Sequence, residues 1–224
     1  MIINSYQSKN VDIFVFIRDL LQTITEDYVY SKAYSLGEGV KEIIKDPKIW
    51  ENGSIPSEDT IQTMINEVVK SGAAKTRNYK KWILGYGLVL LCAIFDDFLN
   101  DLLEEILTKN IEFTRWNNKQ EIMDKFKEGT IKYKYKVFVN KLGFSESEFF
   151  DFKMFIPRIQ LKHAGVNLAK LIDIYKKRNH AAHSDSYVIY TIEELEEIKD
   201  LFEKLIWNLS RKSKDKWNVE FKLV

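Results

Sequence analysis

Apolar residues recur every three or four positions along most of this chain, which is the spacing of an amphipathic α-helix. The first such stretch covers residues 9–34, and Gly37 and Gly39 are expected to end it. The next begins after Ser57, a residue type suited to an N-cap, and runs to Gly72, where a C-terminal stop is expected. This repeated spacing predicts an all-α fold.

The stretch 76–109 is the longest and most apolar of the predicted helices. Few polar faces remain through its middle, so it is expected to be packed on most sides at the centre of a bundle. Asp96 and Asp97 interrupt its apolar residues, and they either face solvent or meet a buried partner such as Arg178. Exposure is the expectation, because carboxylates are seldom buried.

Residues 111–156 form a predicted insertion between two core helices. Asn118 can cap a helix over 119–128, and residues 145–148 match a capping box for a later one. The stretch 132–142 opens with alternating Lys and Tyr, so strand and helix compete, and helix is favoured. Its tyrosines could stack on bases while its lysines pair with phosphates, although such a stripe is more often core aromatics with lysines outside.

Another helix is predicted over 192–209, where Thr191 and Glu194 match a second capping box. The tail 217–224 alternates apolar and polar residues at the period of a strand. Together these patterns predict a helical bundle with a long central apolar helix, a helical insertion and room for a short C-terminal strand.

The length of 224 residues suits a single domain, with 45% apolar and 13% aromatic residues to build its core. We expect N-terminal helices in 1–75, a core in 76–209 that contains the insertion, and a tail in 210–224. Cys92 is the single cysteine and lies in an apolar run, which indicates a buried small side chain and a reducing compartment. The N-terminus lacks signal-peptide character, and the apolar segment 82–95 is short for a membrane span, so a cytoplasmic location without membrane contact is expected.

Ionisable chemistry gathers in residues 172–185. Two of the three histidines, His180 and His183, lie here, whereas His163 is expected to be a surface or packing residue. A cationic cluster precedes them, made of Lys176, Lys177 and Arg178. An apolar helix running from near Gly165 or Asn167 to about Ala182 would present these groups at its end.

The spacing of these residues determines which of them share a face of the helix. Asn179 and His183 are four apart and lie on one face, whereas Arg178 and His183 are five apart, about 140° around the helix. Arg178 and His183 converge only if the arginine reaches across, the helix distorts, or a second subunit completes the site. An arginine fits a phosphate with two parallel hydrogen bonds, and a histidine can move protons near neutral pH. The pair could therefore cleave a phosphodiester without a metal.

Arg178, Asn179 and His183 resemble the R-x-x-x-x-H signature, with a polar residue after the arginine, of the HEPN superfamily of all-α ribonucleases. The resemblance is to HEPN-like proteins of the RiboL-PSP/MAE type. Residues 86–107 look like the long core helix that these proteins place before the motif helix, so the resemblance covers residues 76–209.

The resemblance implies a metal-independent endoribonuclease acting on single-stranded or loop RNA. His183 would act as general base on the ribose 2′-OH or as general acid to the leaving oxygen. Arg178 would stabilise charge on the phosphate, and Asn179 would orient His183 or a phosphate oxygen.

The resemblance also implies a homodimer whose two motifs face each other, and settings such as toxin–antitoxin pairs and anti-phage defence with a neutralising or defence partner protein. The other candidate site residues contact RNA or support the motif. The candidates for RNA binding are Lys176, Lys177 and His180, and the candidates for support are Asp96 and Asp97.

Other interpretations of the same residues remain open. Histidines at a helix end can bond to the terminal carbonyls and interact with the helix dipole. His180 and His183 could be two ligands of a metal, but zinc needs three or four, so no metal or cofactor is predicted. The alternative function is a non-catalytic helical module that binds RNA or a protein.

Overall fold

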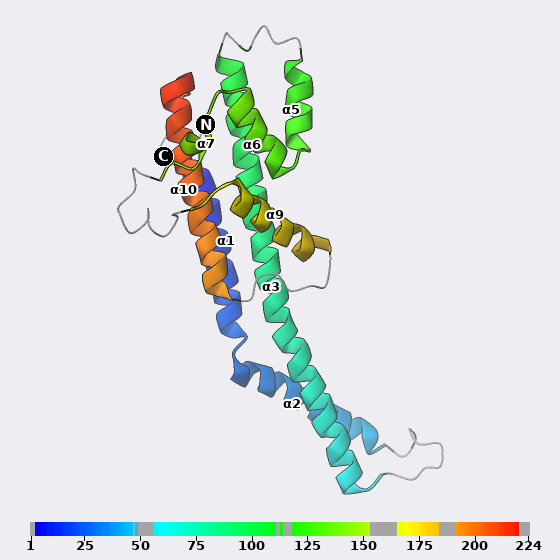
Figure 1. Ribbon diagram of the computed structural model, residues 1–224. Coiled ribbons are helices and arrows are strands. Elements are labelled where there is room, and N and C mark those ends of the chain that lie inside the picture. Colours follow the sequence, from blue (N-terminus) through cyan, green and yellow to red (C-terminus); the bar gives the residue numbers. More distant parts are fainter. Residues whose placement is uncertain are drawn as a thin grey trace. The chain divides into compact units, whose positions relative to one another are not determined.

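The computed structural model describes residues 3–46, 48, 56–110, 113, 118–152, 165–183 and 191–219 (Figure 1). Of these residues 86% are helical and none lies in a strand, which confirms the predicted all-α fold. His163 and residues 220–224 of the predicted terminal strand lie outside the described residues.

The predicted helix over 9–34 is two helices, α1 (Ile3–Thr23) and α2 (Glu26–Ile44). Thr25 separates them, because its backbone is extended and its side chain accepts a hydrogen bond from the Tyr28 N–H at 3.1 Å. This is an N-cap, which starts a new helix at Glu26. The apolar spacing continues across the break, so periodicity alone did not reveal it.

The third helix, α3 (Glu58–Lys109), has 52 residues and contains the predicted helix 76–109 as its C-terminal part. Ser57 caps it as predicted, since its Oγ accepts from the Thr60 N–H at 3.3 Å. By length and composition α3 could cross a membrane, but 56% of its most apolar window is buried in the structure. The core helix of a soluble protein passes the same test.

The chain divides into two compact units, one formed by Phe16–Ile83 and the other by Met1–Val15 with Leu84–Val224. Helix α3 contributes residues 58–83 to the first and 84–109 to the second. The motif region lies wholly in the second unit.

In the unit Phe16–Ile83, glycines lie inside helices where the sequence predicted helix ends. Gly37 is buried within α2, and a Cβ there would lie 2.9 Å from Val69 Cγ2 of α3. Gly72 lies within α3, and a Cβ there would lie 3.5 Å from the Ala33 Cβ. The predicted stops at Gly37, Gly39 and Gly72 were therefore wrong. At Gly37 the missing side chain lets α2 and α3 approach closely, which offsets a helix-propensity cost of about 1 kcal/mol, whereas a Cβ at Gly72 would make ordinary van der Waals contact.

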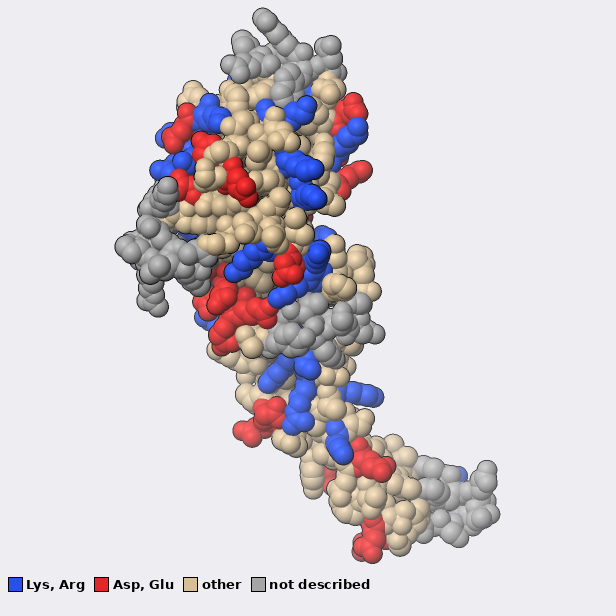
Figure 2. All heavy atoms as spheres, in the orientation of Figure 1, with Lys and Arg blue, Asp and Glu red and all other residues tan. Residues whose placement is uncertain are grey.

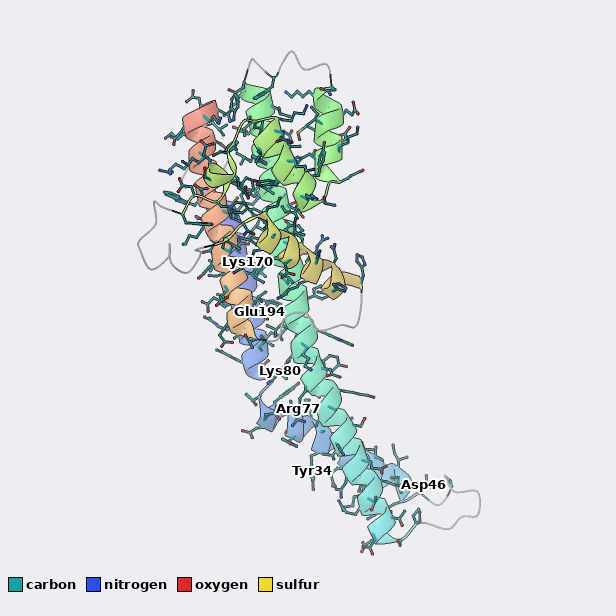
Figure 3. The ribbon with its side chains drawn as sticks, viewed as in Figure 1. Tyr34, Asp46, Arg77, Lys80, Lys170 and Glu194 are labelled. Atoms are coloured by element: carbon teal, nitrogen blue, oxygen red, sulfur yellow. The ribbon has the colours of Figure 1, made fainter. Side chains whose placement is uncertain are left out.

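A charged group also joins α2 to α3 in this unit. Arg77 Nη2 donates to Glu26 Oε2 at 2.7 Å and to the Tyr30 hydroxyl at 3.1 Å, and Figure 3 labels the arginine. The guanidinium lowers the pKa of Glu26. Arg77, part of a basic group in the sequence, thus has a structural role.

Among its described residues, the second unit contains the first part of α1, the second half of α3 and five further helices. They are α5 (Lys119–Lys127), α6 (Ile131–Asn140), α7 (Glu146–Phe149), α9 (Leu168–His183) and α10 (Ile192–Trp217). Figure 1 shows α5 and α6 as a pair beside the end of α3, joined by a short connection.

Local caps explain where several of these helices begin. The Ser145 and Glu148 capping box is present as predicted, and the Thr191 side chain accepts from the Glu194 N–H at 3.1 Å. Asn118 stands at the N-cap of α5, but its side chain makes no capping hydrogen bond. The choice of helix over strand for 132–142 is confirmed by α6.

Helix α10 extends eight residues past the predicted end at 209, through Trp217, so Trp217 is helical and not part of a strand. Asn218 then ends the helix with a left-handed backbone, φ 49°. Trp217 packs on Phe113 with ring centroids 4.8 Å apart, and this contact stabilises the additional turns of α10.

Aromatic rings fill the core of the second unit. Phe95 of α3 stacks on Phe202 of α10 with centroids 4.7 Å apart, and both are fully buried. Each such side chain contributes roughly 1.5–3 kcal/mol relative to exposure. Asn208 of α10 also donates to the Phe149 carbonyl at 3.0 Å, which ties α7 to the bundle. These contacts hold fixed the surfaces against which α9 packs.

Candidate functional site

Helix α9 carries the whole predicted motif and begins where the sequence placed its start. The Asn167 side chain accepts from the Lys170 N–H at 3.2 Å, so Asn167 caps the helix. Leu171, Ile174 and Tyr175 are buried on its inner face. At its other end α9 lies close to α3, since a Cβ built on Gly85 would be 3.3 Å from the Ala181 Cβ. The motif therefore lies on a capped helix whose C-terminal part packs against α3.

Arg178 and His183 lie on the same continuous helix, which ends at His183. The helix is not interrupted between them, so the separation of about 140° expected for five residues applies. Arg178 is half-buried and its Nη1 donates to Asn179 Oδ1 at 3.0 Å, whereas His183 is exposed. The structure brings Arg178 and Asn179 into contact, whereas His183 lies on a different face of α9 from Arg178.

Arg178 and Asn179 line a pocket of about 400 Å³, which we call the α6–α9 pocket. Its walls come from α3, from the connection between α5 and α6, from the first turn of α6 and from α9. Its lining residues are Asp96, Glu128, Gly129, Thr130, Ile131, Lys132, Ile172, Tyr175, Lys176, Arg178 and Asn179. The pocket is thus partly basic and partly apolar, and His183 is not in its described lining.

Lys134 forms a buried ion pair behind this pocket. Its Nζ lies 2.8 Å from Asp96 Oδ1 and 3.1 Å from Asn100 Oδ1, and its side chain is 2% exposed. The ammonium also lies 5.4 Å from the centre of the Phe126 ring. The partner of Asp96 is therefore Lys134 and not Arg178, and the expectation that Asp96 is exposed was wrong, since Asp96 is only 22% exposed.

Lys134 was not among the predicted site residues, because the lysines of this stretch were expected to face outward. The spacing of apolar residues along the helix nevertheless indicated that Lys134 is buried. Lys134 is three residues after Ile131 and four before Phe138, and both are buried. Lys132 and Lys136 are exposed, as the more common interpretation of the stripe requires, and Tyr135 is buried.

Tyr175 forms part of the pocket floor and is buried. Its hydroxyl donates to the Cys92 carbonyl at 3.4 Å. Burial, followed by the negative charge of Asp96, raises the pKa of Tyr175 well above its usual value. Burial likewise raises the pKa of the Cys92 thiol, as expected for a small core side chain. Both groups are neutral at physiological pH, so they shape the pocket without adding charge.

The other predicted site residues lie in different environments. Lys176 is exposed and lines the α6–α9 pocket. Lys177 instead donates to Glu194 Oε1 of α10 at 2.8 Å. His180 and Asp97 are exposed, Asp97 as predicted. Of the predicted RNA-binding and support residues, Lys176 and Asp96 therefore share the pocket with Arg178.

Lys177 belongs to a second depression, the α9–α10 groove of about 250 Å³. Lys170 of α9 and Glu194 of α10, both labelled in Figure 3, line it. The ion pair of Lys177 with Glu194 joins these two helices, which gives Lys177 a structural explanation.

Charge on the surface is mixed, in line with a net charge of +1. In the upper part of Figure 2, which holds residues of the second unit, basic and acidic side chains are interspersed. Attraction of an anionic ligand therefore depends on local clusters such as the α6–α9 pocket. Within the described ranges, no group of three or more His, Cys, Asp or Glu could hold a metal ion.

Comparison with known proteins gives one match. The sequence model of one protein family, described as RiboL-PSP-HEPN, matches residues 54–215. That range includes all of α3 and the whole of α9, and hence the Arg178, Asn179 and His183 set. Neither the curated proteins nor the solved structures gave a match.

Proposed function

Since the chain belongs to the RiboL-PSP-HEPN family, we propose that it is an endoribonuclease, in keeping with the RNase activity generally associated with HEPN domains. The proposed reaction is metal-independent cleavage of single-stranded or loop RNA. The ribose 2′-oxygen forms a bond to the adjacent phosphorus while the bond from phosphorus to the 5′-oxygen breaks. The 2′-hydroxyl proton goes to a general base, and the leaving 5′-oxygen takes a proton from a general acid.

The observation that carries the proposal is the setting of Arg178. Its guanidinium is half-buried in a pocket, and its Nη1 bonds to Asn179, its neighbour on α9. The Nε atom is buried without an acceptor among the described residues. A guanidinium with donors to spare in a partly desolvated pocket suits a phosphate, which offers several acceptor oxygens. In the transition state it would stabilise the growing charge on those oxygens.

His183 is the proposed proton carrier, because it is an exposed imidazole four residues from Asn179. Within one chain it lies about 140° around α9 from Arg178, so both can act on one phosphate if two chains contribute. We therefore propose a homodimer in which His183 meets Arg178 of the partner subunit across a two-fold axis. Closed two-fold symmetry is the commonest arrangement of homo-oligomers.

The experiment that tests the activity compares wild type with three single variants on a short fluorescent RNA. Wild type should cleave it, and Arg178→Ala and His183→Ala should each lower the rate by at least about 100-fold. Because His183 is exposed, His183→Ala should change the free energy of unfolding by no more than about 0.5 kcal/mol. Asn179→Ala should have a smaller effect on the rate, since it orients and does not transfer a proton.

A wild-type rate in either Arg178→Ala or His183→Ala would contradict the catalytic assignment. Absence of cleavage by wild type, with RNA still bound, would favour a non-catalytic binding module. Circular dichroism of each variant checks that the fold is retained.

The proposed biological role is a cytoplasmic toxin or anti-phage defence effector with a neutralising or defence partner protein. A free ribonuclease would damage cellular RNA, so its activity would need such restraint. Expression of the intact chain should slow bacterial growth, whereas His183→Ala should not. Equal growth of cells expressing either protein would contradict the proposed biological role but not the proposed RNA cleavage.

A further inference from the structure

We infer that the α6–α9 pocket binds the nucleotide next to the cleaved phosphate, with Lys132 and the first turn of α6 as its outer wall. The inference rests on the proposed ribonuclease activity and extends it to residues outside the motif. It assigns a ligand class, an RNA nucleotide, to a pocket of about 400 Å³. Pockets of this size hold small-molecule ligands and cofactors.

The charge of the pocket favours an anion. Three cations from two helices line it: Lys132 of α6, and Lys176 and Arg178 of α9. Asp96 is already paired with the buried Lys134 at 2.8 Å, so Arg178 does not have to neutralise it. Glu128 is the other carboxylate among the described lining residues. The buried pair thus leaves a pocket with excess positive charge.

The backbone adds to this preference. Thr130 caps α6, and residues Thr130, Ile131 and Lys132 of its first turn line the pocket. The N-terminus of a ten-residue helix carries partial positive charge, which favours phosphate. The N-terminus of α6, the two lysines and Arg178 therefore all line the same pocket.

The remaining lining suits the sugar and base of a nucleotide. Ile131, Ile172 and Tyr175 provide an apolar and aromatic surface within the same pocket. Apolar and aromatic surfaces accept the flat faces of bases, while nearby cations hold the backbone. A free inorganic phosphate would leave this surface unused, so a nucleotide fits better.

Two lysines of α6 provide a matched test. Lys132 and Lys136 are both exposed and lie four residues apart on one helix, but only Lys132 lines the pocket. Binding of a fluorescent RNA carrying 2′-deoxy sugars is measured by anisotropy, with His183→Ala as the full-length background. Lys132→Ala should weaken binding by roughly three- to tenfold, and Lys136→Ala by less than about twofold. Equal weakening by both would mean general charge attraction and would overturn the inference.

A second measurement places the ligand without relying on activity. The isoleucine methyl groups are observed by NMR while adenosine monophosphate, uridine monophosphate or inorganic phosphate is added to the full-length protein. Ile131 and Ile172 should shift with the nucleotides and less with phosphate, while Ile198 of the α9–α10 groove should not shift. No shift at Ile131 and Ile172, or an equal shift at Ile198, would overturn the inference.

The two proposals can fail separately. If wild type cleaves RNA but Lys132→Ala binds it as well as Lys136→Ala does, the nucleotide pocket is wrong and the ribonuclease stands. If nucleotides shift Ile131 and Ile172 but wild type never cleaves RNA, the pocket stands and the nuclease is wrong.

Discussion

The ammonium group of Lys134 lies 2.8 Å from Asp96 Oδ1, although only 2% of the lysine side chain is exposed. A charge buried to this extent needs a partner, because desolvation would otherwise make the charged form unstable. Asp96 also lines the α6–α9 pocket, and its negative charge helps to raise the pKa of Tyr175. The pair therefore joins α6 to α3 directly behind Arg178.

Replacing Lys134 with Met should destabilise the protein, because it leaves Asp96 charged and only 22% exposed. Breaking a buried pair costs about 3–5 kcal/mol, and some access to water at Asp96 reduces the expected loss to roughly 2 kcal/mol. Urea unfolding followed by circular dichroism measures it. The double variant Lys134→Met/Asp96→Leu should recover most of the loss, since no unpaired charge remains. A single variant as stable as wild type would mean that the pair contributes nothing.

The ends of the RNA product report the nucleophile. If the ribose 2′-OH attacks, the products carry a 2′,3′-cyclic phosphate or 3′-phosphate and a 5′-hydroxyl, and EDTA does not stop the reaction. An RNA with a 2′-deoxy sugar at the cleaved position should be inert, because it lacks the nucleophile. Mass spectrometry of a short oligonucleotide, with and without EDTA, gives the answer. A 3′-hydroxyl with a 5′-phosphate, or loss of cleavage in EDTA, would point to metal-activated water instead.

Mixing two inactive variants tests whether the site is shared between chains. A dimer of Arg178→Ala with His183→Ala has one damaged site and one complete site if each site combines the two residues in trans. Random exchange of subunits should then restore up to about a quarter of wild-type activity. Each variant measured alone is the control and should be inactive. No recovery after verified exchange would place both residues in one chain, and an active monomer of 26.5 kDa by light scattering would exclude the dimer.

Glu148 should make stability depend on pH. The Ser145 N–H donates to Glu148 Oε2 at 2.7 Å, and this bond is the main reason why the pKa of Glu148 is lowered from 4.5. A lowered carboxyl pKa stabilises the fold above the unfolded-state value, and the stabilisation is lost as pH falls through the folded-state value. Glu148→Gln should therefore unfold at lower urea than wild type at pH 7, and the difference should shrink toward pH 3.

Glu196→Gln, at an exposed position of α10, is the control and should match wild type at both values of pH. If the loss of stability caused by Glu148→Gln is the same at pH 7 and at pH 3, the ionised carboxylate is not the source of that stability.

The sequence predicted the positions of helices correctly where an N-cap residue or a regular apolar spacing marks them. Thr191, Ser145 and Ser57 mark their helices correctly, because an N-cap needs only its own side chain and the next few N–H groups. The predicted helix end at Gly37 was wrong for the opposite reason. Whether a glycine ends a helix or lets another helix approach closely depends on what packs against it, and at Gly37 that residue is Val69 of α3.

The sequence by itself placed Arg178 and Asn179 on one helix with His183 at its end, and it indicated that Arg178 and His183 diverge around that helix, since their spacing follows the helical repeat. Only the tertiary structure decided what surrounds them. Lys134 comes from another helix and takes Asp96 as its partner, leaving Arg178 in a basic pocket. Pairing between residues 38 positions apart is set by the packing of α6 against the core, and no local spacing encodes it.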